Sequence, residues 1–364
     1  MSKHLNILPF NEWCNNGNQP LIISGPCSAE TEEQVLKTAK KINATGQVKI
    51  FRAGIWKPRT RPHSFEGIGE EALLWLKQVQ QETSLKTAVE VANPKHVELA
   101  LKHGVDILWL GARTVVNPFS VQEIADSLKG VDVPVLVKNP LNPDISLWIG
   151  ALERINDAGI NKMMAIHRGF DFFKKSIYRN APMWEIPIEL KRRIPNLPIL
   201  VDPSHIAGKR ELLFDIAQKA LDLDMNGLMI ESHINPDIAI TDAAQQLKPE
   251  HLNDLLNKIV IRRQKGNYNF QHKLEEQRSE IDKLDAELIE ILARRFEIID
   301  EIGEYKLNNN ITIYQAKRWS NILKERLENG EEQGINKEFL MKVLQLVHKE
   351  SIQRQTHIYQ NKSV

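Results

Sequence analysis

Residues 20–28 read PLIISGPCS, a short apolar run that ends in small and polar residues. Seven more runs of this kind follow it: VKIFRAG (48–54), LKTAVEV (85–91), DILWLGAR (106–113), VPVLVKN (133–139), KMMAIHRG (162–169), LPILVDPSH (197–205) and GLMIESH (227–233). Amphipathic stretches such as 30–42 and 211–224 lie between them, and Gly or Pro precedes several of the runs. Eight strand–helix units in about 240 residues predict an α/β fold, a closed (β/α)8 (TIM) barrel. A doubly wound open sheet is the alternative, but no GxGxxG turn follows the first strand.

The composition and the hydrophobic pattern of the sequence change after residue 262. Residues 262–269 read RRQKGNYN, a polar stretch with Gly266 that we interpret as a linker. Residues 270–307 then run without proline and repeat apolar residues at helical spacing: Leu274, Ile281, Leu284, Leu288, Ile291 and Ile298. Two more helical patterns follow, at about 314–329 and 336–358. We therefore predict a barrel at 1–262, a linker at 263–269 and an all-helical, three-helix domain at 270–364.

Composition argues against several classes of protein. Lys and Arg (48) almost balance Asp and Glu (47), which argues against a general nucleic-acid or membrane-surface coat. No apolar run is long enough to span a bilayer, and the opening MSKHLNILPFNEW lacks the apolar core of a signal peptide. Two cysteines, Cys14 and Cys27, in so long a chain indicate a reducing compartment. We expect a cytoplasmic protein without nucleic-acid or membrane partners.

Charged or metal-capable residues stand at nearly every predicted strand end. In chain order they are Cys27, Arg52, Lys57, Glu90, Arg113, Lys138, His167, Arg168, Asp202, His205, Glu231 and His233. Because the catalytic groups of such barrels lie where strands end, this placement predicts an active site. Solvated loop charges are the alternative, but these would scatter both signs.

Two chemistries separate within this set. Five cations form a basic bowl suited to small phosphorylated acids: Arg52, Lys57, Arg113, Lys138 and Arg168. Cys27, His205, Glu231 and Asp242 offer a mixed sulfur, nitrogen and oxygen donor set for a divalent ion such as Mn, Fe, Co or Zn. Taken singly, each of the four also has an ordinary structural interpretation, such as a buried thiol or a carboxylate at a helix N-terminus.

A series of motifs resembles a known family. SGPCS, FRAGIWKPRT, GAR, PVLVKNP, RG, VDPSH and GLMIESH…TDA occur in this order over residues 18–262. In this order they resemble the type I 3-deoxy-D-arabino-heptulosonate 7-phosphate (DAHP) synthases without long barrel extensions. The resemblance implies condensation of phosphoenolpyruvate with erythrose 4-phosphate, the entry step of the shikimate pathway to chorismate and the aromatic amino acids.

The resemblance also assigns roles to residues. It maps the metal ligands onto Cys27, His205, Glu231 and Asp242, with one divalent ion per barrel and manganese favoured. It maps phosphoenolpyruvate contacts onto Arg52, Lys57, Arg113, Lys138 and Arg168, and the sugar phosphate contacts onto Arg59 and Thr60 of KPRT. Arg61 and His63 receive no role.

The expected mechanism joins the two substrates at the metal, which acts as a Lewis acid on the aldehyde oxygen. Glu90 is a candidate to assist the attacking water, although it could merely hold a loop, and Lys57 is a candidate for proton transfer as well as anion binding. The sister reaction on arabinose 5-phosphate is the rival, but there an Asn is expected where this chain has Pro58. His167 is a departure, since an acid is expected before Arg168-Gly169, and it bears on how Arg168 is oriented.

The helical domain carries its own cations. Arg295 and Lys306 lie on nearly one helix face, whereas Arg278 lies about 25 Å further along the axis and is turned away. A helix of nearly 40 residues, about 55 Å long, is too long for two shorter helices to cover its apolar seam. An intertwined homodimer would cover the apolar seam, and the partner would supply Arg278. A plain coiled-coil dimerisation arm is the alternative.

Residues 278–306, RSEIDKLDAELIEILARRFEIIDEIGEYK, resemble the first helix of the all-helical chorismate mutases. The resemblance implies rearrangement of chorismate to prephenate without a cofactor. It maps dicarboxylate contacts onto Arg278, Arg295, Lys306 and Arg318, and late contacts onto Ser351 and Gln355. Gln355 would bond the ether oxygen that gains charge as the bond breaks. Trp319 and Gln315 replace acids that are frequent in that family, which affects the expected contact to the substrate hydroxyl.

The sequence thus predicts a bifunctional transferase and isomerase. We expect feedback regulation of the barrel through the helical domain, with prephenate or chorismate as the ligand. The alternative is a DAHP synthase with a catalytically silent helical module for dimerisation and effector binding.

Overall fold

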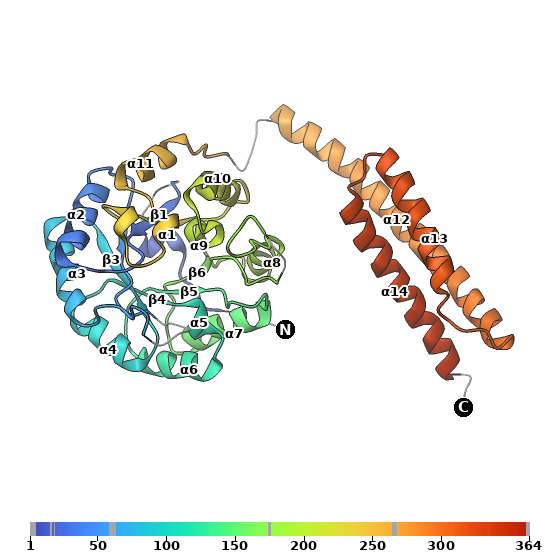
Figure 1. Ribbon diagram of the computed structural model, residues 1–364, viewed down its shortest axis with the longest axis horizontal. Helices are drawn as coiled ribbons and strands as arrows, with labels where there is room; N and C mark the ends of the chain where they lie inside the picture. Colours follow the sequence, from blue (N-terminus) through green and yellow to red (C-terminus); the bar gives the residue numbers. More distant parts are fainter. Residues whose placement is uncertain are drawn as a thin grey trace. The chain divides into compact units, whose positions relative to one another are not determined.

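The computed structural model describes residues 5–14, 17, 19–57, 63–173, 176–263 and 268–361, with the side chains of 268 and 269 excepted. The chain divides into two compact units, Met1–Gln264 and Lys265–Val364. Figure 1 shows the first as strands surrounded by helices and the second as helices alone. Within the described part of the chain, no helix combines the length and apolar character needed to cross a membrane.

The first unit is the predicted closed barrel. Eight parallel strands pair in chain order, and β8 closes the ring on β1. The strands are β1 (Leu21–Gly25), β2 (Ile50–Arg52), β3 (Lys86–Val91), β4 (Ile107–Leu110), β5 (Val135–Lys138), β6 (Met163–His167), β7 (Ile199–Val201) and β8 (Gly227–Glu231). Each lies inside one of the eight apolar runs, so the fold predicted from the sequence is confirmed.

Helices precede and follow the strands, and most of them cover the outside of the barrel. They are α1 (Phe10–Trp13), α2 (Glu32–Asn43), α3 (Glu71–Glu82), α4 (Pro94–Lys102), α5 (Ala112–Val115), α6 (Pro118–Ser127), α7 (Ile145–Asp157), α8 (Glu185–Arg193), α9 (Pro203–Ala207), α10 (Leu213–Asp222) and α11 (Pro249–Lys258). Three short 3-10 turns, η1 (Arg210–Leu212), η2 (Pro236–Ile238) and η3 (Ala243–Gln245), lie in the loops after β7 and β8. Side-chain caps begin several helices; Asn93, Asn117 and Asp144 each accept a backbone N–H of the first turn.

Alternating strand residues build two apolar layers. Ile23, Trp109 and Met164 belong to a cluster inside the barrel, where α1 also packs. Val89, Ala165 and Val201 belong to the larger layer between the strands and the helices. Both layers are nearly inaccessible to water, so the strands form a rigid frame whose carboxyl ends position the loops that follow them.

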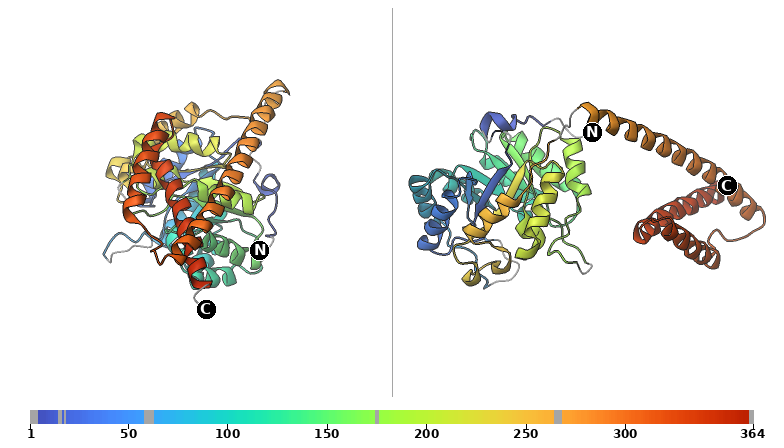
Figure 2. Two further views of the ribbon diagram at one scale, coloured as in Figure 1. Left: turned by 90° about the vertical axis from the view of Figure 1, so that its right-hand side faces the viewer. Right: turned by 90° about the horizontal axis from the view of Figure 1, so that it is seen from above.

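The second unit holds α12 (Tyr268–Asn308), α13 (Ala316–Glu332) and α14 (Lys337–Asn361). The two further views show the long α12 together with the two shorter helices (Figure 2), and α14 contacts both α12 and α13. Among the described residues of this unit, Leu327 is the only buried apolar side chain. A unit that buries so little apolar surface in one chain lacks the core that a stable domain needs.

Candidate active sites

Four side chains converge at the carboxyl ends of β1, β7 and β8. Cys27 follows β1, Glu231 ends β8 and Asp242 lies in the loop after β8, and one ligand atom of each lies within 4.8 Å of the other two. His205, in α9 after β7, places Nε2 3.8 Å from Glu231 Oε1 and 4.0 Å from Asp242 Oδ2. Because β8 pairs with both β1 and β7, the barrel brings these residues close together in space although they are far apart in the sequence. The structure therefore brings the four candidate metal ligands together.

Hydrogen bonds and backbone conformation orient these four side chains toward a common point. Asp202 caps α9 by accepting the His205 backbone N–H at 3.0 Å, and its other oxygen lies 2.8 Å from His205 Nδ1. The imidazole therefore turns Nε2 toward the cluster. Asp242 holds a left-handed backbone, with φ 49°, which Asp tolerates better than most residues. The Cys27 backbone N–H donates to Gln246 Oε1 at 2.9 Å.

The chemistry of this donor set fits a divalent cation. Burial, together with the nearby Glu231 carboxylate, raises the pKa of the Cys27 thiol to about 11. Glu231 Oε1 is buried and accepts no hydrogen bond from any residue that the structure describes. A bound cation would favour the thiolate and neutralise the carboxylates, so it would remove both penalties. Sulfur, imidazole and carboxylate ligands in one set suit a borderline ion such as Mn, Fe, Co or Zn.

Two of the predicted cations contact this cluster directly. Arg52 is only 1% exposed, with Nη1 3.3 Å from Glu231 Oε1 and Nη2 donating to the Cys27 carbonyl at 3.2 Å. Its guanidinium also lies 5.0 Å from the Trp109 ring centroid. Lys57 Nζ donates to the same carbonyl at 2.9 Å and lies 3.2 Å from Cys27 Sγ. Both side chains therefore help to hold the cluster, whatever else they bind.

The other predicted cations lie beside the cluster. Lys138 Nζ donates to Asp202 Oδ2 at 2.8 Å, the carboxylate that orients His205. Arg168 Nη1 donates to Asn180 Oδ1 at 2.9 Å. Burial, with the nearby positive charges of Arg179 and the exposed Arg113, lowers the pKa of Arg168 to about 10 despite neighbouring carboxylates. Cations gathered in this way are stabilised by an anionic ligand.

Glu90 is held in a specific orientation near these groups. Trp109 Nε1 donates to Glu90 Oε2 at 3.2 Å. A Cβ atom at Gly111 would lie 2.0 Å from Glu90 Oε1, so the carboxylate fills space that only glycine leaves. The side chain is half-buried rather than spread over a loop surface. This placement is compatible with a role in orienting water.

The remaining residues singled out from the sequence have no described contact with the cluster. Arg59, Thr60 and Arg61 fall outside the described residues, and His63 is exposed. His233 is buried with Nε2 3.6 Å from Glu30 Oε2.

His167 packs between the sheet and the helices, 5.3 Å from the Trp184 ring and 5.6 Å from the Phe170 ring. Burial lowers the pKa of His167 to about 3, so the ring is neutral. The contacts of the neighbouring Arg168 are made by Asn180 and, through the backbone, by Asn139.

Three residues that frame the cluster were not predicted from the sequence. Arg179 lies 3.0 Å from Asp242 Oδ1 and donates to Gln245 Oε1 at 2.8 Å. Gln245 Nε2 donates in turn to Glu231 Oε2 at 2.7 Å, and Gln246 holds the Cys27 backbone. The two glutamines belong to the loop after β8, and Arg179 belongs to the irregular segment after β6. Proximity to the TDA motif was the only sequence signal for the glutamines.

The helical unit contains a second candidate site, a cavity of about 320 Å³ between its three helices. Its lining includes the cations Arg295, Lys306, Arg318 and Arg326, together with Gln315, Trp319, His348, Ser351 and Gln355. Arg295 Nη1 donates to Ser351 Oγ at 2.8 Å, and Lys306 Nζ donates to the Ile313 carbonyl at 2.6 Å. No Asp or Glu belongs to this lining. The site is therefore built for an anion.

The predicted residues of the helical domain divide into two groups. Arg295, Lys306, Arg318, Ser351 and Gln355 all line the cavity. Arg278 does not; it is exposed and pairs with Glu275 of its own helix at 2.8 Å. Gln355 is 5% exposed, and its Oε1 has no hydrogen-bond partner among the described residues.

Comparisons with known proteins identify the family of each unit. The sequence profile of the DAHP synthetase I family matches residues 11–264. The chain belongs to this family. A second profile, chorismate mutase type II, matches residues 277–356. The protein is therefore a fusion of a type I DAHP synthase domain and a type II chorismate mutase domain, as the motifs predicted.

Relatives of the DAHP synthase domain support the assignment. Phospho-2-dehydro-3-deoxyheptonate aldolase of Thermotoga maritima is 33% identical over 242 residues, which are 65% of this chain and 68% of that protein. A crystal structure of this aldolase, titled a DAHP synthase, matches with a TM-score of 0.61 at 27% identity, covering 71% of this chain and 76% of that one. 2-dehydro-3-deoxyphosphooctonate aldolase of Desulfotalea psychrophila is 26% identical, over 67% of this chain and 90% of that protein.

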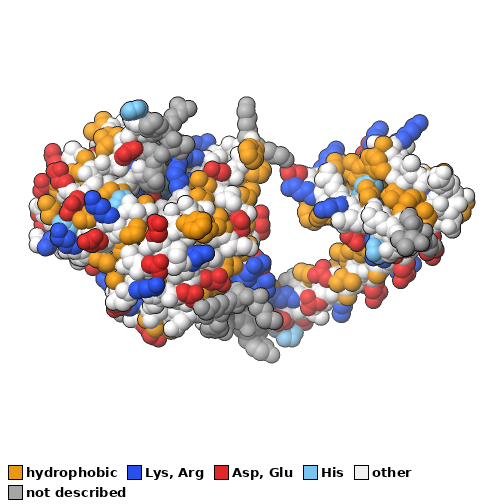
Figure 3. All heavy atoms as spheres, turned by 90° about the horizontal axis from the view of Figure 1, so that it is seen from below, with side chains coloured by type: hydrophobic (Ala, Val, Ile, Leu, Met, Phe, Trp, Pro, Cys, Tyr) orange, Lys and Arg blue, Asp and Glu red, His pale blue; other side chains and the backbone are white. Residues whose placement is uncertain are grey.

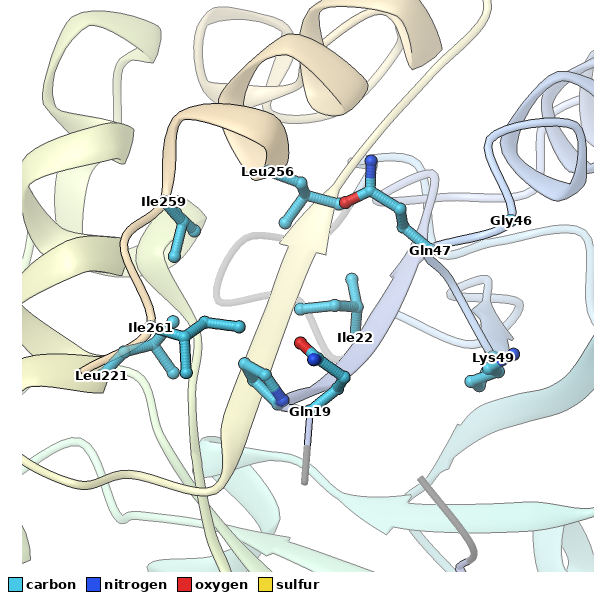
Figure 4. Close-up of a pocket in the computed structure, with 10 residues that line it drawn as sticks. Gln19, Ile22, Gly46, Gln47, Lys49, Leu221, Leu256, Ile259 and Ile261 are labelled. Carbon is cyan, nitrogen blue, oxygen red and sulfur yellow. The ribbon is translucent and has the colours of Figure 1, made fainter. Parts of the chain in front are cut away.

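A different cavity of the DAHP synthase barrel is unrelated to these groups. About 460 Å³ of space lies beside the starts of β1 and β2, lined by Gln19, Ile22, Lys49, Leu256 and Ile261 among others (Figure 4). Its lining contains none of the strand-end residues discussed above. Active sites of such barrels lie at the opposite, carboxyl end of the strands, so this cavity is not the synthase site.

The framing residues of the DAHP synthase domain give a first prediction. Arg179→Ala should weaken binding of Mn²⁺ about 10- to 100-fold, the range seen when partners of metal ligands are removed. The reason is that Asp242 and Gln245 would both lose the group that orients them. Calorimetric titration of the metal-free protein with Mn²⁺ measures this effect directly. Arg192→Ala, which removes an exposed arginine paired with Glu189, is the matched control and should leave Mn²⁺ affinity unchanged. Equal affinities in both variants would contradict the prediction.

Proposed function

We propose that the barrel catalyses the metal-dependent condensation of phosphoenolpyruvate with erythrose 4-phosphate, giving DAHP and inorganic phosphate. The observation that carries this proposal is the convergence of Cys27, His205, Glu231 and Asp242 on one point. The cations Arg113, Lys138 and Arg168 lie beside or near them, at the carboxyl end of the barrel. The order of motifs along the chain and the 33% identical heptonate aldolase support the same reaction.

The chain's own residues would divide the work as follows. Arg113 and Arg168 bind phosphate oxygens, because guanidinium groups match them in charge and shape. Lys138 and the buried Arg52 contribute further positive charge to phosphoenolpyruvate. A divalent ion held by the four ligands would supply Lewis acidity toward a substrate carbonyl oxygen. The ion would lie near Lys57, whose Nζ is 3.2 Å from Cys27 Sγ.

Bond changes in this reaction balance without a redox partner. The methylene carbon of phosphoenolpyruvate attacks the aldehyde carbon and forms the new carbon–carbon bond. Water adds to the carbon that bears the phosphate ester, and phosphate leaves with the carbon–oxygen bonding electrons. Glu90 orients that water, and Lys57 moves a proton to or from the substrate oxygen.

The test of this function is loss of phosphoenolpyruvate with erythrose 4-phosphate, first in metal-stripped protein and then after Mn²⁺ is restored. We expect loss only with metal present. Arabinose 5-phosphate is the parallel substrate, since octonate aldolases are also relatives. Loss with arabinose 5-phosphate instead would reassign the sugar. No loss with either sugar would refute the proposal.

We propose that the helical domain rearranges chorismate to prephenate in the cationic cavity. Arg295, Lys306 and Arg318 bind the two carboxylates, and Gln355 donates to the ether oxygen as its bond breaks. This rearrangement needs no cofactor and no acid–base residue. Incubation with chorismate and detection of prephenate tests the proposal and separates it from a silent dimerisation module.

The active form of this domain would be a homodimer. Ile281, Leu284, Leu288 and Ile291 of α12 are each more than half exposed within one chain. Figure 3 shows hydrophobic atoms gathered on the surface of the helical unit. A second copy would bury this stripe and could bring its Arg278 to the cavity, which Arg278 of the same chain does not line.

Leu288→Glu should therefore convert the protein to a monomer and abolish mutase activity, while the barrel retains metal-dependent synthase activity. A buried, unpaired carboxylate at the dimer interface lowers the stability of the dimer by several kcal/mol. This loss is larger than the stabilisation from burying the few apolar groups beside it. Sedimentation velocity measures the assembly. Lys283→Glu, an exposed charge change on the same helix, is the control. A dimer that survives Leu288→Glu would show that α12 does not form the interface.

Feedback regulation of the barrel by prephenate or chorismate is the last part of the proposal. A later enzyme of the same pathway is covalently attached, and the two units leave no third one for effectors within the described chain. The synthase rate of the full-length protein should fall when either compound is added. An unchanged rate with both compounds would remove this part of the proposal.

A further inference from the structure

The cavity of the helical domain contains a histidine to which neither the sequence nor the family comparison gave a role. His348, on α14, lines the cavity with Arg295, Lys306 and Arg318. Its Nε2 is buried and has no hydrogen-bond partner among the described residues. A buried polar atom without a partner is costly, and its position in a binding cavity indicates that a ligand supplies the partner.

A stacked tryptophan fixes the plane of this ring. The centroids of Trp319 and His348 are 3.8 Å apart, and their planes differ by 7°. Tyr314 approaches the imidazole from another side, with centroids 6.1 Å apart. Trp319 stands on α13, so the stack connects two helices across the cavity. Such a stack leaves the imidazole little freedom to turn Nε2 away.

The electrostatics of the cavity favour the uncharged form of the imidazole. Partial burial lowers the pKa of His348, and the charges of Arg295 and Lys306 lower it further. Arg318 and Arg326 of α13 add positive charge from the other side, and no carboxylate belongs to the lining. A neutral imidazole carries one lone pair, so it can accept a hydrogen bond that none of the surrounding cations can accept.

One polar group of the substrate, its ring hydroxyl, is left to bond this acceptor. Chorismate has two carboxylates, which match the cations, and an ether oxygen, which matches Gln355. Its remaining polar group is the ring hydroxyl, an O–H donor. Gln315 also lines the cavity, but its side chain is exposed to solvent, whereas His348 Nε2 is buried and has no hydrogen-bond partner among the described residues.

We propose that His348 Nε2 accepts the hydrogen bond of the substrate's ring hydroxyl, and that stacking on Trp319 holds it in position. This inference rests on the proposed mutase function of the cavity. The pair Trp319 and His348 would then supply the hydroxyl recognition for which the mutase resemblance predicts an acid, with a neutral group in its place. His348 thereby becomes a specificity-determining residue.

Two oxabicyclic diacids that mimic the transition state of the rearrangement, one with the ring hydroxyl and one without it, test the proposal. Their dissociation constants would be measured by calorimetry on the whole chain and on its His348→Leu variant. The wild type should prefer the hydroxyl-bearing diacid, and His348→Leu should reduce that preference about tenfold while binding the other diacid unchanged. His348→Gln, which keeps an acceptor, should restore part of the preference. His357→Leu, an exposed histidine on the same helix, is the control.

The outcomes distinguish a binding role from a packing role. Equal weakening of both diacids in His348→Leu would show that His348 only packs, and would overturn the inference. An unchanged preference would also overturn it. Trp319→Phe should keep most of the preference, because a ring still covers the imidazole. If the wild type discriminates the diacids through His348 but does not convert chorismate, the mutase function fails and the recognition of a hydroxylated diacid stands.

Discussion

Glu231→Gln should abolish synthase activity and lower the affinity for Mn²⁺ by more than about 100-fold, the upper range for indirect partners of a metal ligand. The Glu231 carboxylate is fully buried. It accepts a hydrogen bond from Gln245 Nε2 at 2.7 Å, and it lies 3.3 Å from Arg52 Nη1. The amide replaces a negative ligand with a neutral one of the same shape. It also leaves the guanidinium of Arg52 buried without its nearest counter-charge, which typically costs about 3–5 kcal/mol of stability.

The fusion supplies its own control for this experiment. Mutase activity depends on the helical domain, so it should be unchanged in Glu231→Gln and report that the protein is still assembled. Calorimetry gives the Mn²⁺ affinity, and phosphoenolpyruvate loss gives the synthase rate. Glu33→Gln, on the surface of α2, should behave as the wild type. A Glu231→Gln variant that binds Mn²⁺ within about threefold of the wild type would show that Glu231 is not a ligand.

The barrel could be predicted because short-range patterns determine its strands, and the candidate metal ligands follow from where those strands end. Apolar runs mark the strands, and the rule that catalytic groups follow strand ends places Cys27, His205 and Glu231 at one end of the barrel. Asp242 was included because it lies just beyond the eighth predicted strand, although its loop is irregular and has no periodicity. The long helix could also be predicted, because its apolar spacing is independent of any partner.

The residues that support the ligands could not be predicted in this way. Arg179 reaches Asp242 from the segment after β6, which has neither strand nor helix periodicity. Arg52 was predicted as a substrate contact, and no sequence pattern indicated that burial would place it against Glu231. His348 was overlooked because a histidine on an amphipathic helix carries no pattern of its own; the unpartnered Nε2 is visible only once α12, α13 and α14 enclose a cavity.

Gln355→Ala should lower the rate of chorismate rearrangement by about 10²–10³-fold while leaving synthase activity unchanged. The reaction breaks an ether bond without acid–base help, so stabilisation of the developing negative charge carries much of the rate enhancement. Removal of one preorganised donor of this kind costs about that factor in kcat. Gln355 is preorganised because it is 5% exposed on α14, and a Cβ atom at Gly303 would lie only 3.1 Å from its Cγ.

The size of the effect on kcat separates this role from simple binding. If Gln355 donates to the ether oxygen as charge develops, kcat should fall far more than the affinity for chorismate. Gln353→Ala, two residues away on the exposed side of the same helix, should leave both unchanged. A variant whose KM rises while kcat stays within about threefold would assign Gln355 to ground-state binding. The cations Arg295 and Lys306 would then account for the catalysis of this site, since they are the charged groups of α12 that remain in the cavity.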